Sequence, residues 1–343
     1  MTERPWKHGR ARMDWSKGYR AVVYGEFVDK NSWKGYERFE IKSGKVRRDS
    51  SALRQSADLE CDGYERREAW IRIWMDVSQN GASDHVALFT GLATSPKRNI
   101  EGSSIRTPVQ CFSVLKPAED EHLLRGWFAP DGIPCNIILK DLLKNTPAPL
   151  EFAGEAPALR TPIIAEENET GVTMTDKILD AINWRLKING KGEIWIGPQA
   201  IAESETFDSL SNDCLEPAVD VVNDWFDCPN VFRATRGEES VVARDESEGE
   251  LSIGSRGREI WKEEASSGLS ESESLLDYAQ RKLKELQTYA ETMTYSRRFV
   301  PDVNVTDLVR VEDPKQKLSG VYRVTSQTLE LGSAARTSEE VRR

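Results

Sequence analysis

The first third of the chain alternates short apolar runs with polar residues. Between Tyr19 and Leu115, β-branched and aromatic residues gather in runs of four to eight, separated by Gly, Asn, Ser and Pro. The runs are AVVYGEFV, RFEI, WIRIWMDV, VALFTGLA and VQCFSVL. This pattern is typical of short strands, and it predicts an antiparallel barrel or sandwich.

One of these runs, WIRIWMDV, predicts what its two faces contact. Successive side chains of a strand point to opposite faces. The alternation gives one set of Ile71, Ile73, Met75 and Val77 and another of Trp70, Arg72, Trp74 and Asp76. Because the second set mixes tryptophan with charge, we expect that face to pack on another domain or subunit.

The middle of the chain changes to a helical period. Ile138, Leu139, Leu142 and Leu143 recur at helical spacing after Cys135, and a second helix is predicted from Thr173, with a Thr173–Asp176 capping box. Two short strands then flank the Gly-rich turn 189–192, which predicts a hairpin over 186–196. We expect a small α/β insert here.

Strand patterns return at Val231–Arg236 and Glu239–Asp245, and they precede the most regular helical pattern of the chain. Ser270 with Glu273 predicts the start of a helix over 270–291. One face of this helix carries Leu275, Leu276, Ala279, Leu283, Leu286 and Ala290. We expect it to cover the open side of a C-terminal barrel, whose last strand pattern begins at Gly320.

The predicted fold is mainly β with an α+β insert: two tube-like antiparallel β-barrel domains linked by a helical segment and a small α/β domain. The predicted boundaries are a first barrel over 1–115, a helical connector over 116–150, a small α/β insert over 151–228, a second barrel with a packed helix over 229–331 and a flexible C-terminal tail over 332–343. The tail is expected to be ordered only by a partner.

Composition agrees with several small modules. A chain of 343 residues exceeds what one core normally serves, and its 38% apolar residues fall below the usual fraction of about 45–50%. The net charge of −10 is uneven, with +5 over residues 1–115, −12 over 116–228 and −3 over 229–343. Without a coherent basic face, a nucleic-acid-binding role is disfavoured.

Cysteine usage and hydropathy indicate a protein made in the cytoplasm. The sequence contains no apolar run of about 18 residues and no apolar segment after its basic start, so neither a membrane span nor a secretion signal is predicted. The five cysteines are widely spaced, and we expect all of them to be free thiols: Cys61, Cys111, Cys135, Cys214 and Cys228.

No set of residues with catalytic or metal-binding spacing stands out. The histidines, His8, His85 and His122, lack a second ligand at zinc-like spacing, and no phosphate-binding or nucleophile motif occurs. We therefore predict no catalytic residue, no cofactor and no metal site. Ten tryptophans instead suggest interfaces, above all Trp6 and Trp15 in the basic N-terminal segment.

The order of these elements resembles the baseplate hub proteins of phage tails and tail-like injection systems, including the late control D type. The resemblance covers most of residues 19–331 and lies in pattern: Ser56–Leu59 before WIRIWMD, then Leu88–Gly91, and Phe299–Pro301 before a final hairpin. Such hubs often have Gly-Asp before the strand that follows, where this chain has Thr306 and Asp307.

The resemblance implies a non-enzymatic structural protein of the virion, in the tail baseplate. Three chains would form a pseudo-hexameric ring that joins the hexameric tail tube to a three-fold spike or tip. The implied partners are other copies of the chain, the tail tube protein, the spike or tail-tip protein, other baseplate subunits and the tape measure protein. DNA would meet the chain only while passing through the lumen.

Two alternatives stay open at the level of the sequence. A tail-tip module that binds a receptor or glycan would need an exposed aromatic groove. A tail-associated cell-wall hydrolase would need paired carboxylates, which only their separation in space can identify among 57 acidic residues.

Overall fold

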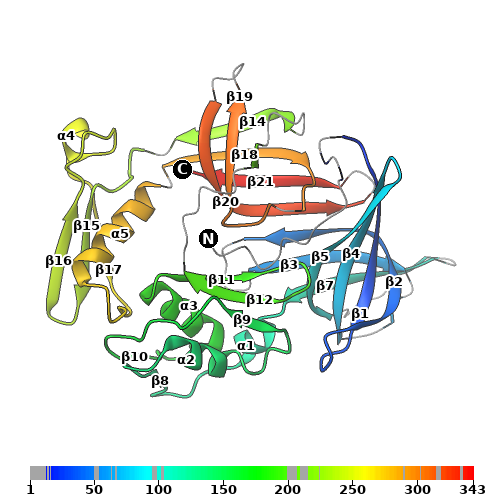
Figure 1. The fold of residues 1–343 in the computed structure, drawn as a ribbon, viewed down its shortest axis with the longest axis horizontal. Coiled ribbons are helices and arrows are strands. Elements are labelled where there is room, and N and C mark those ends of the chain that lie inside the picture. The colour runs from blue at the N-terminus through cyan, green and yellow to red at the C-terminus, as the bar shows by residue number, and fades with distance from the viewer. Residues whose placement is uncertain are drawn as a thin grey trace.

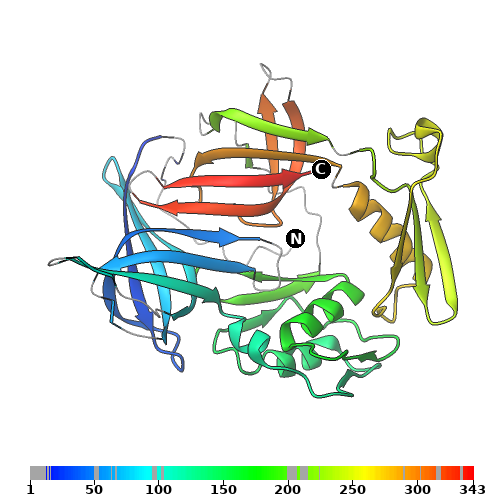
Figure 2. The same ribbon diagram turned by 180° about the vertical axis from the view of Figure 1, so that it is seen from behind.

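The computed structural model describes residues 13, 15, 17–49, 54–62, 64–65, 68–94, 99–101, 104–198, 207–208, 215–223, 225–288, 290–301, 303–313, 318–332 and 335–343. Four regions are visible in Figures 1 and 2, and we name them the first barrel, the second sheet, the α/β unit and the outer unit. The first barrel and the outer unit lie at opposite ends of the molecule, with the other two regions between them.

The first barrel is a closed ring of antiparallel strands. Its strands are β1 (Arg20–Val28), β2 (Gly35–Arg48), β3 (Gln55–Asp62), β4 (Glu68–Gln79), β5 (Ala82–Thr94) and β7 (Ser104–Ser113), and the short β6 (Asn99–Glu101) pairs with β7. The pairings run β1–β4–β5–β7–β3–β2, and β2 pairs again with β1. Closure gives these strands partners on both sides, which confirms the antiparallel barrel predicted here.

The inside and outside of this barrel follow the alternation in the sequence. Ile71, Ile73 and Met75 are fully buried in its core, and Leu88 and Phe89 of β5 lie in the same core. The side chains between them on β4 point away from that core, as strand geometry requires.

A second, open sheet continues from the first barrel. Its strands are β13 (Phe207–Asp208), β14 (Leu215–Asn223), β18 (Glu291–Arg298), β19 (Leu308–Asp313), β20 (Leu318–Leu331) and β21 (Arg336–Arg342). The long β20 pairs with β2 through its last residues and with β19 through its first. The two regions therefore form one continuous 13-stranded sheet.

The prediction of a flexible C-terminal tail is wrong. Residues 336–342 form β21, which lies between β20 and β18 and pairs with both. Thr337, Glu339 and Val341 are buried there. The charged composition of this segment concealed a strand because one of its inward-facing residues is itself a carboxylate.

The α/β unit contains every short element from residue 116 to residue 198. Its elements are α1 (Lys116–Asp120), β8 (Phe128–Ala129), α2 (Cys135–Leu142), β9 (Leu150–Phe152), β10 (Ile163–Ile164), α3 (Gly171–Ala181), β11 (Trp184–Ile188) and β12 (Ile194–Pro198). Helix α2 and the hairpin β11–β12 lie where the sequence placed them. Helix α3 begins earlier, and its capping box is formed by Thr170 with Thr173.

The predicted connector and insert share one apolar core in the α/β unit. Buried side chains from both segments, including Leu139, Ile178 and Ile196, pack in that core. Strands β13 and β14, which the sequence placed in the insert, instead pair with β19 and β18 of the second sheet.

The outer unit is a three-stranded sheet covered by one helix. It contains β15 (Val231–Arg236), β16 (Glu239–Arg244), α4 (Ile253–Arg256), β17 (Trp261–Ala265) and α5 (Leu275–Gln287). Ser274 and Asp277 form the capping box of α5, four residues later than predicted.

Helix α5 does not lie on a C-terminal barrel, which corrects the prediction. Leu275 and Leu283 pack with Phe232 and Ala243 of β15 and β16, whereas Leu276 is 44% exposed. The apolar face of the helix was predicted, but its partner was not, because periodicity carries no information about which sheet a helix covers.

Candidate functional site

The described residues contain no group of three or more metal-binding side chains gathered in one place. His85 stacks on Trp74 with ring centroids 3.9 Å apart and contacts Asp76, and the backbone of His122 bridges to Thr170. His8 lies outside the described residues. Both described histidines therefore have structural neighbours typical of a protein surface.

The cysteines have the environment of buried structural thiols. Cys61, Cys111 and Cys135 are free and buried, Cys228 is also buried, and Cys214 lies outside the described residues. Burial raises the pKa of Cys61 and of Cys135 to about 12, and that of Cys111 well above its ordinary value. Since the thiolate is the reactive form, Cys61, Cys111 and Cys135 are poor nucleophiles.

The hairpin β11–β12 joins the α/β unit to the first barrel. Thr90 donates a hydrogen bond to the carbonyl oxygen of Gly190 (2.8 Å), and Trp33 Nε1 and Arg72 donate to that of Lys191 (3.0 and 3.2 Å). Arg72 Nε also donates to Thr90 Oγ1 (3.0 Å). Trp70 packs against the core of the α/β unit, so this part of the tryptophan face contacts another domain, as the sequence predicted.

Glycine is required at the tip of this hairpin. A Cβ atom on Gly190 would lie 1.8 Å from the carbonyl oxygen of Ala87, which belongs to the backbone of β5. Backbone cannot move aside as a flexible side chain can, so the close approach of the two regions depends on the missing side chain.

A network of polar side chains lies where the first barrel meets the second sheet. Arg48 donates to Asn304 Oδ1 (2.7 Å), to Gln327 Oε1 (3.2 Å) and to the carbonyl oxygen of Leu88 (2.6 Å). Burial lowers the pKa of Arg48 to about 10, against the opposing charges of Asp307 and Glu339. At that pKa the guanidinium stays charged at neutral pH, so its hydrogen bonds are charge-assisted.

A fully buried ion pair lies in the second sheet next to this network. Arg297 of β18 and Glu339 of β21 have no exposed side-chain surface, and Arg297 Nε donates to Glu339 Oε2 at 2.8 Å. Gln327 of β20 donates both to Glu339 Oε1 (2.6 Å) and to the carbonyl oxygen of Val303 (2.8 Å). Together with Gln327, the pair therefore connects the three adjacent strands β20, β21 and β18.

Thr306 and Asp307 stand at the two positions where the baseplate hub proteins often have Gly and Asp. The Asp307 carboxylate accepts a hydrogen bond from the Asn304 amide (3.0 Å) and lies 3.5 Å from Lys187 Nζ of the α/β unit. The preceding residue, Thr306, has φ +76°. This left-handed conformation favours glycine, which explains why a glycine suits that position.

The outer wall of the first barrel carries a ladder of aromatic rings and charges. Arg38 lies 4.3 Å above the ring of Tyr24, Tyr24 stacks on His85 at 6.1 Å, and His85 stacks on Trp74. Trp74 Nε1 donates to Glu26 Oε2 at 2.8 Å. These residues extend the tryptophan face beyond the contact with the α/β unit.

The tryptophans singled out by the sequence have different environments. Trp225 and Trp261 are 40% and 41% exposed. Trp33 and Trp127 pack against the α/β core, and Trp15 packs edge-on against Tyr19 and Phe299. Trp6 lies outside the described residues. Further exposed apolar side chains are Val221, Val222, Leu124, Phe128, Ile137, Ile164 and Phe226.

No helix within the described part of the chain is long and apolar enough to cross a membrane.

The arrangement of a closed barrel, a second β region that continues its sheet, and inserted α/β units is the fold of phage-type tail proteins. A tail protein from Neisseria meningitidis MC58 matches with a TM-score of 0.67 and 14% identity, over 95% of this chain and 97% of that one. The 43 kDa tail protein of prophage MuSo2 from Shewanella oneidensis matches with a TM-score of 0.66 and 14% identity, over 93% and 97%.

A third structure of this fold is the prophage tail protein gp18 from Listeria monocytogenes EGD-e, with a TM-score of 0.56 and 9% identity, over 94% of each chain. No protein-family profile and no curated protein sequence matches this chain. The resemblance to tail proteins found in the sequence is thus confirmed at the level of the fold, over nearly the whole chain.

Proposed function

We propose that this chain is a structural hub of a phage or phage-like tail and has no catalytic activity. The observation that carries the proposal is the match of nearly the whole chain to nearly the whole of a tail protein. A partial match would leave room for an added catalytic domain, whereas here the fold of a tail protein accounts for almost every residue. Because fold alone does not fix function, the proposal also rests on the buried cysteines, whose raised pKa values make them poor nucleophiles.

Three copies would form a ring with pseudo-six-fold symmetry, each contributing its first barrel and its second sheet as two tube-like regions. The continuous pairing of β2 with β20 supports this arrangement, because it fixes the two regions in one rigid relation. Such a ring would join the hexameric tail tube on one side to a three-fold spike or tip on the other. DNA would contact it only while passing through the lumen.

The partners of such a ring are other copies of the chain, the tail tube protein, the spike or tip protein and other baseplate subunits, with the tape measure protein reaching the lumen. In the particle, the chain would be confined to the tail baseplate after synthesis in the host cytoplasm. The aromatic ladder on the outer wall of the first barrel, whose Tyr24 and Trp74 are half-buried, is the kind of surface that such contacts cover.

Inactivation of the gene tests this proposal. Cells that lack the protein should make heads but no complete tails, and the wild-type chain supplied from a plasmid should restore tails. Normal tails in the absence of the protein would contradict a hub role.

A separate experiment tests the hydrolase alternative. The purified protein should clear no zone in a gel cast with bacterial cell wall, under conditions in which lysozyme does. Clearing by the wild-type chain would show an enzyme and overturn the non-catalytic part of the proposal.

A further inference from the structure

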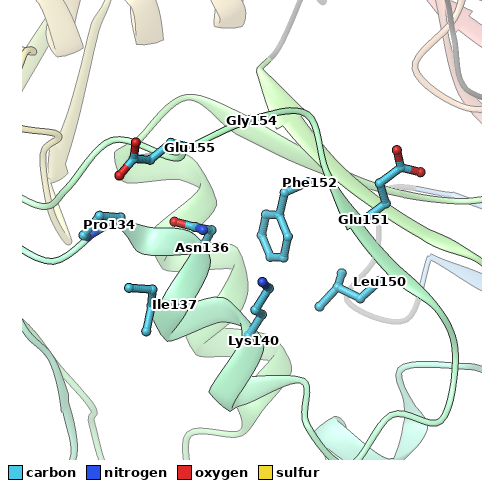
Figure 3. Close-up of a pocket in the computed structure, with 9 residues that line it drawn as sticks. All are labelled: Pro134, Asn136, Ile137, Lys140, Leu150, Glu151, Phe152, Gly154 and Glu155. Atoms are coloured by element: carbon cyan, nitrogen blue, oxygen red, sulfur yellow. The ribbon is translucent and has the colours of Figure 1, made fainter.

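A groove between helix α2 and the segment that begins with strand β9 carries charges of both signs. Figure 3 shows Lys140 among its lining residues, together with the carboxylates of Glu151 and Glu155 and the apolar side chains of Ile137 and Phe152. Because this lining favours neither an acidic nor a basic nor an apolar ligand, the groove selects no class of occupant. The turns of two hairpins show a more specific chemical difference.

The sequence contains two Asn-Gly pairs, and each lies in the turn of a hairpin. Asn80 and Gly81 connect β4 to β5, and Asn189 and Gly190 begin the turn that connects β11 to β12. Such a pair is chemically labile, because glycine has no Cβ atom to shield its backbone nitrogen from the asparagine side chain. The two turns therefore present the same reactive pair in two surroundings.

The Asn80–Gly81 turn is free of packing. Both residues are exposed, and their φ angles of +49° and +83° are those of a two-residue hairpin turn. A Cβ atom added to Gly81 would meet no atom within 4 Å. Among the described residues, neither the side chain of Asn80 nor the backbone N–H of Gly81 has a hydrogen-bond partner. The described structure therefore does not hold the side-chain amide of Asn80 away from the nitrogen of Gly81.

The Asn189–Gly190 turn is held in place by hydrogen bonds. The backbone N–H of Glu193 donates to Asn189 Oδ1 (3.0 Å), and Asn189 Nδ2 donates to Glu193 Oε2 (2.6 Å). The carbonyl oxygen of Gly190 accepts a hydrogen bond from Thr90, and the backbone of Gly190 lies against that of Ala87. The side-chain amide of Asn189 must leave its bonds before it can react, so its reaction is confined to the population in which the turn is open.

We propose that Asn80 is a site of spontaneous deamidation in the folded protein, and that the bonds to Glu193 protect Asn189 from the same reaction. The backbone nitrogen of Gly81 attacks Cγ of Asn80, and a new C–N bond closes a succinimide ring. The side-chain nitrogen leaves as ammonia and takes the proton of the Gly81 N–H.

Water then opens the succinimide at either of its carbonyl carbons. The hydroxyl group of the water stays on the carbon that it attacks, and a proton returns to the nitrogen of Gly81. Opening at one carbon gives aspartate, and opening at the other gives isoaspartate. Water is the only co-reactant, and no electrons are transferred.

Either product changes the end of the hairpin β4–β5. Both add a carboxylate at an exposed position, and isoaspartate also lengthens the main chain within the turn. Gln79 pairs directly with Ala82 across this turn. Because turn geometry fixes hairpin register, isoaspartate should weaken that pairing, whereas pairs farther from the turn, such as Met75 with Val86, should remain.

The experiment incubates the full-length protein in mildly alkaline buffer and follows both asparagines in the same sample by peptide mapping with mass spectrometry. Deamidation is measured as the mass gained when the amide becomes an acid, and chromatography separates aspartate from isoaspartate. We expect Asn80 to react at least about tenfold faster than Asn189, because only Asn189 must first leave its hydrogen bonds. Equal rates, or faster reaction at Asn189, would overturn the proposal.

The same incubation in urea separates the effect of the fold from that of the local sequence. In the unfolded chain the two asparagines should react at similar rates, because the bonds that hold the second turn are lost. Slow reaction of Asn189 in urea would show that its sequence neighbours protect it, and the proposal would fail. It would also fail if Asn80 stayed intact in the folded protein for a time in which the unfolded chain reacts completely.

A substitution tests the cause of the protection. Glu193→Ala removes the carboxylate that accepts from Asn189 Nδ2 and should speed deamidation of Asn189 about threefold or more, with Asn80 unchanged. The matched control Glu239→Ala, at an exposed carboxylate on β16, should change neither rate. If Glu193→Ala and Glu239→Ala had the same effect on Asn189, the assigned role of Glu193 would be wrong.

Discussion

The first barrel and the second sheet have similar strands but reach stability in different ways. The first barrel closes within the chain, and its interior is filled by apolar side chains such as Ile73 and Phe89. The second sheet does not close among the described residues, and its interior holds the ion pair of Arg297 and Glu339. Among its described residues the first barrel contains no such pair, whereas the second sheet combines an apolar cluster, which includes Met293 and Val324, with a buried ion pair and with the last strand of the chain.

The largest effect is expected from removal of that last strand. Deletion of residues 336–343 removes β21, which lies between β20 and β18, so each of these two strands loses the partner on one of its edges. We expect the second sheet to lose its protection against hydrogen exchange while the first barrel keeps its own. Exchange followed by mass spectrometry measures both regions in one sample. Equal loss of protection in both regions would show that they unfold as one unit and would remove the contrast.

The sequence predicted the first barrel well because apolar residues recur at every second position of a strand that buries one face. Ile71, Ile73, Met75 and Val77 stand at every second position of WIRIWMDV, and all four are buried. The hairpin at 189–192 was found from its turn residues, and α5 from its apolar face.

The second sheet was predicted poorly because its buried residues are partly polar. Strand β18 has the sequence ETMTYSRR and strand β21 RTSEEVR, and each buries one member of the ion pair. The two charged partners lie 42 positions apart in the sequence, so no local pattern reveals the pair.

Of the candidate site, the tryptophan face was predicted from the sequence. The polar network around Arg48 was not, because its partners Asn304 and Gln327 lie 256 and 279 positions away in the sequence.

Breaking the buried pair should be the next largest effect. Glu339→Leu removes the buried carboxylate to which Arg297 donates, so we expect a loss of about 3–5 kcal/mol in the free energy of unfolding. The double variant Arg297→Met with Glu339→Leu should recover most of that loss, because it removes both charges. Urea unfolding of the three proteins measures these values. A single variant as stable as the wild type would show that the pair contributes nothing.

The outer unit provides a third case, in which one helix covers a small sheet. Leu283 is 5% exposed in the core of this unit, and Leu283→Ala should cost about 2–5 kcal/mol and lower the yield of complete tails. Leu276→Ala, on the exposed face of the same helix, should cost about 0.5 kcal/mol or less. Thermal unfolding of both variants measures the difference. If α5 were only a surface connector, the two substitutions would lower the unfolding temperature equally.

A smaller effect, of opposite sign, is expected at the strained residue beside the polar network. Thr306→Gly relieves a left-handed backbone conformation and should raise stability by about 0.5–1 kcal/mol after the entropy cost of glycine. Thr306→Ala keeps a Cβ in the same conformation and should give no such gain. Differential scanning calorimetry of both variants resolves the difference, and a less stable glycine variant would show that the threonine side chain is needed.

The smallest effect concerns pH and the contact between Arg54 and Asp176. Burial raises the pKa of Asp176 from 3.8 to about 6, although Arg54 opposes the shift. Between these values the folded chain binds this proton more tightly than the unfolded chain, so the contribution of Asp176 to stability falls as pH rises through the window. Asp176→Asn should therefore show a flatter stability profile there, and Asp141→Asn, at an exposed position on α2, should not. Parallel profiles for Asp176→Asn and the wild type would contradict this assignment.

A reconstruction of the intact particle by electron cryomicroscopy tests the hub proposal most directly, because it counts the copies of this chain where the tail tube ends. We expect three copies, with the first barrel and the second sheet alternating around the lumen as six tube-like regions. Six copies at that position, or none, would contradict the proposal.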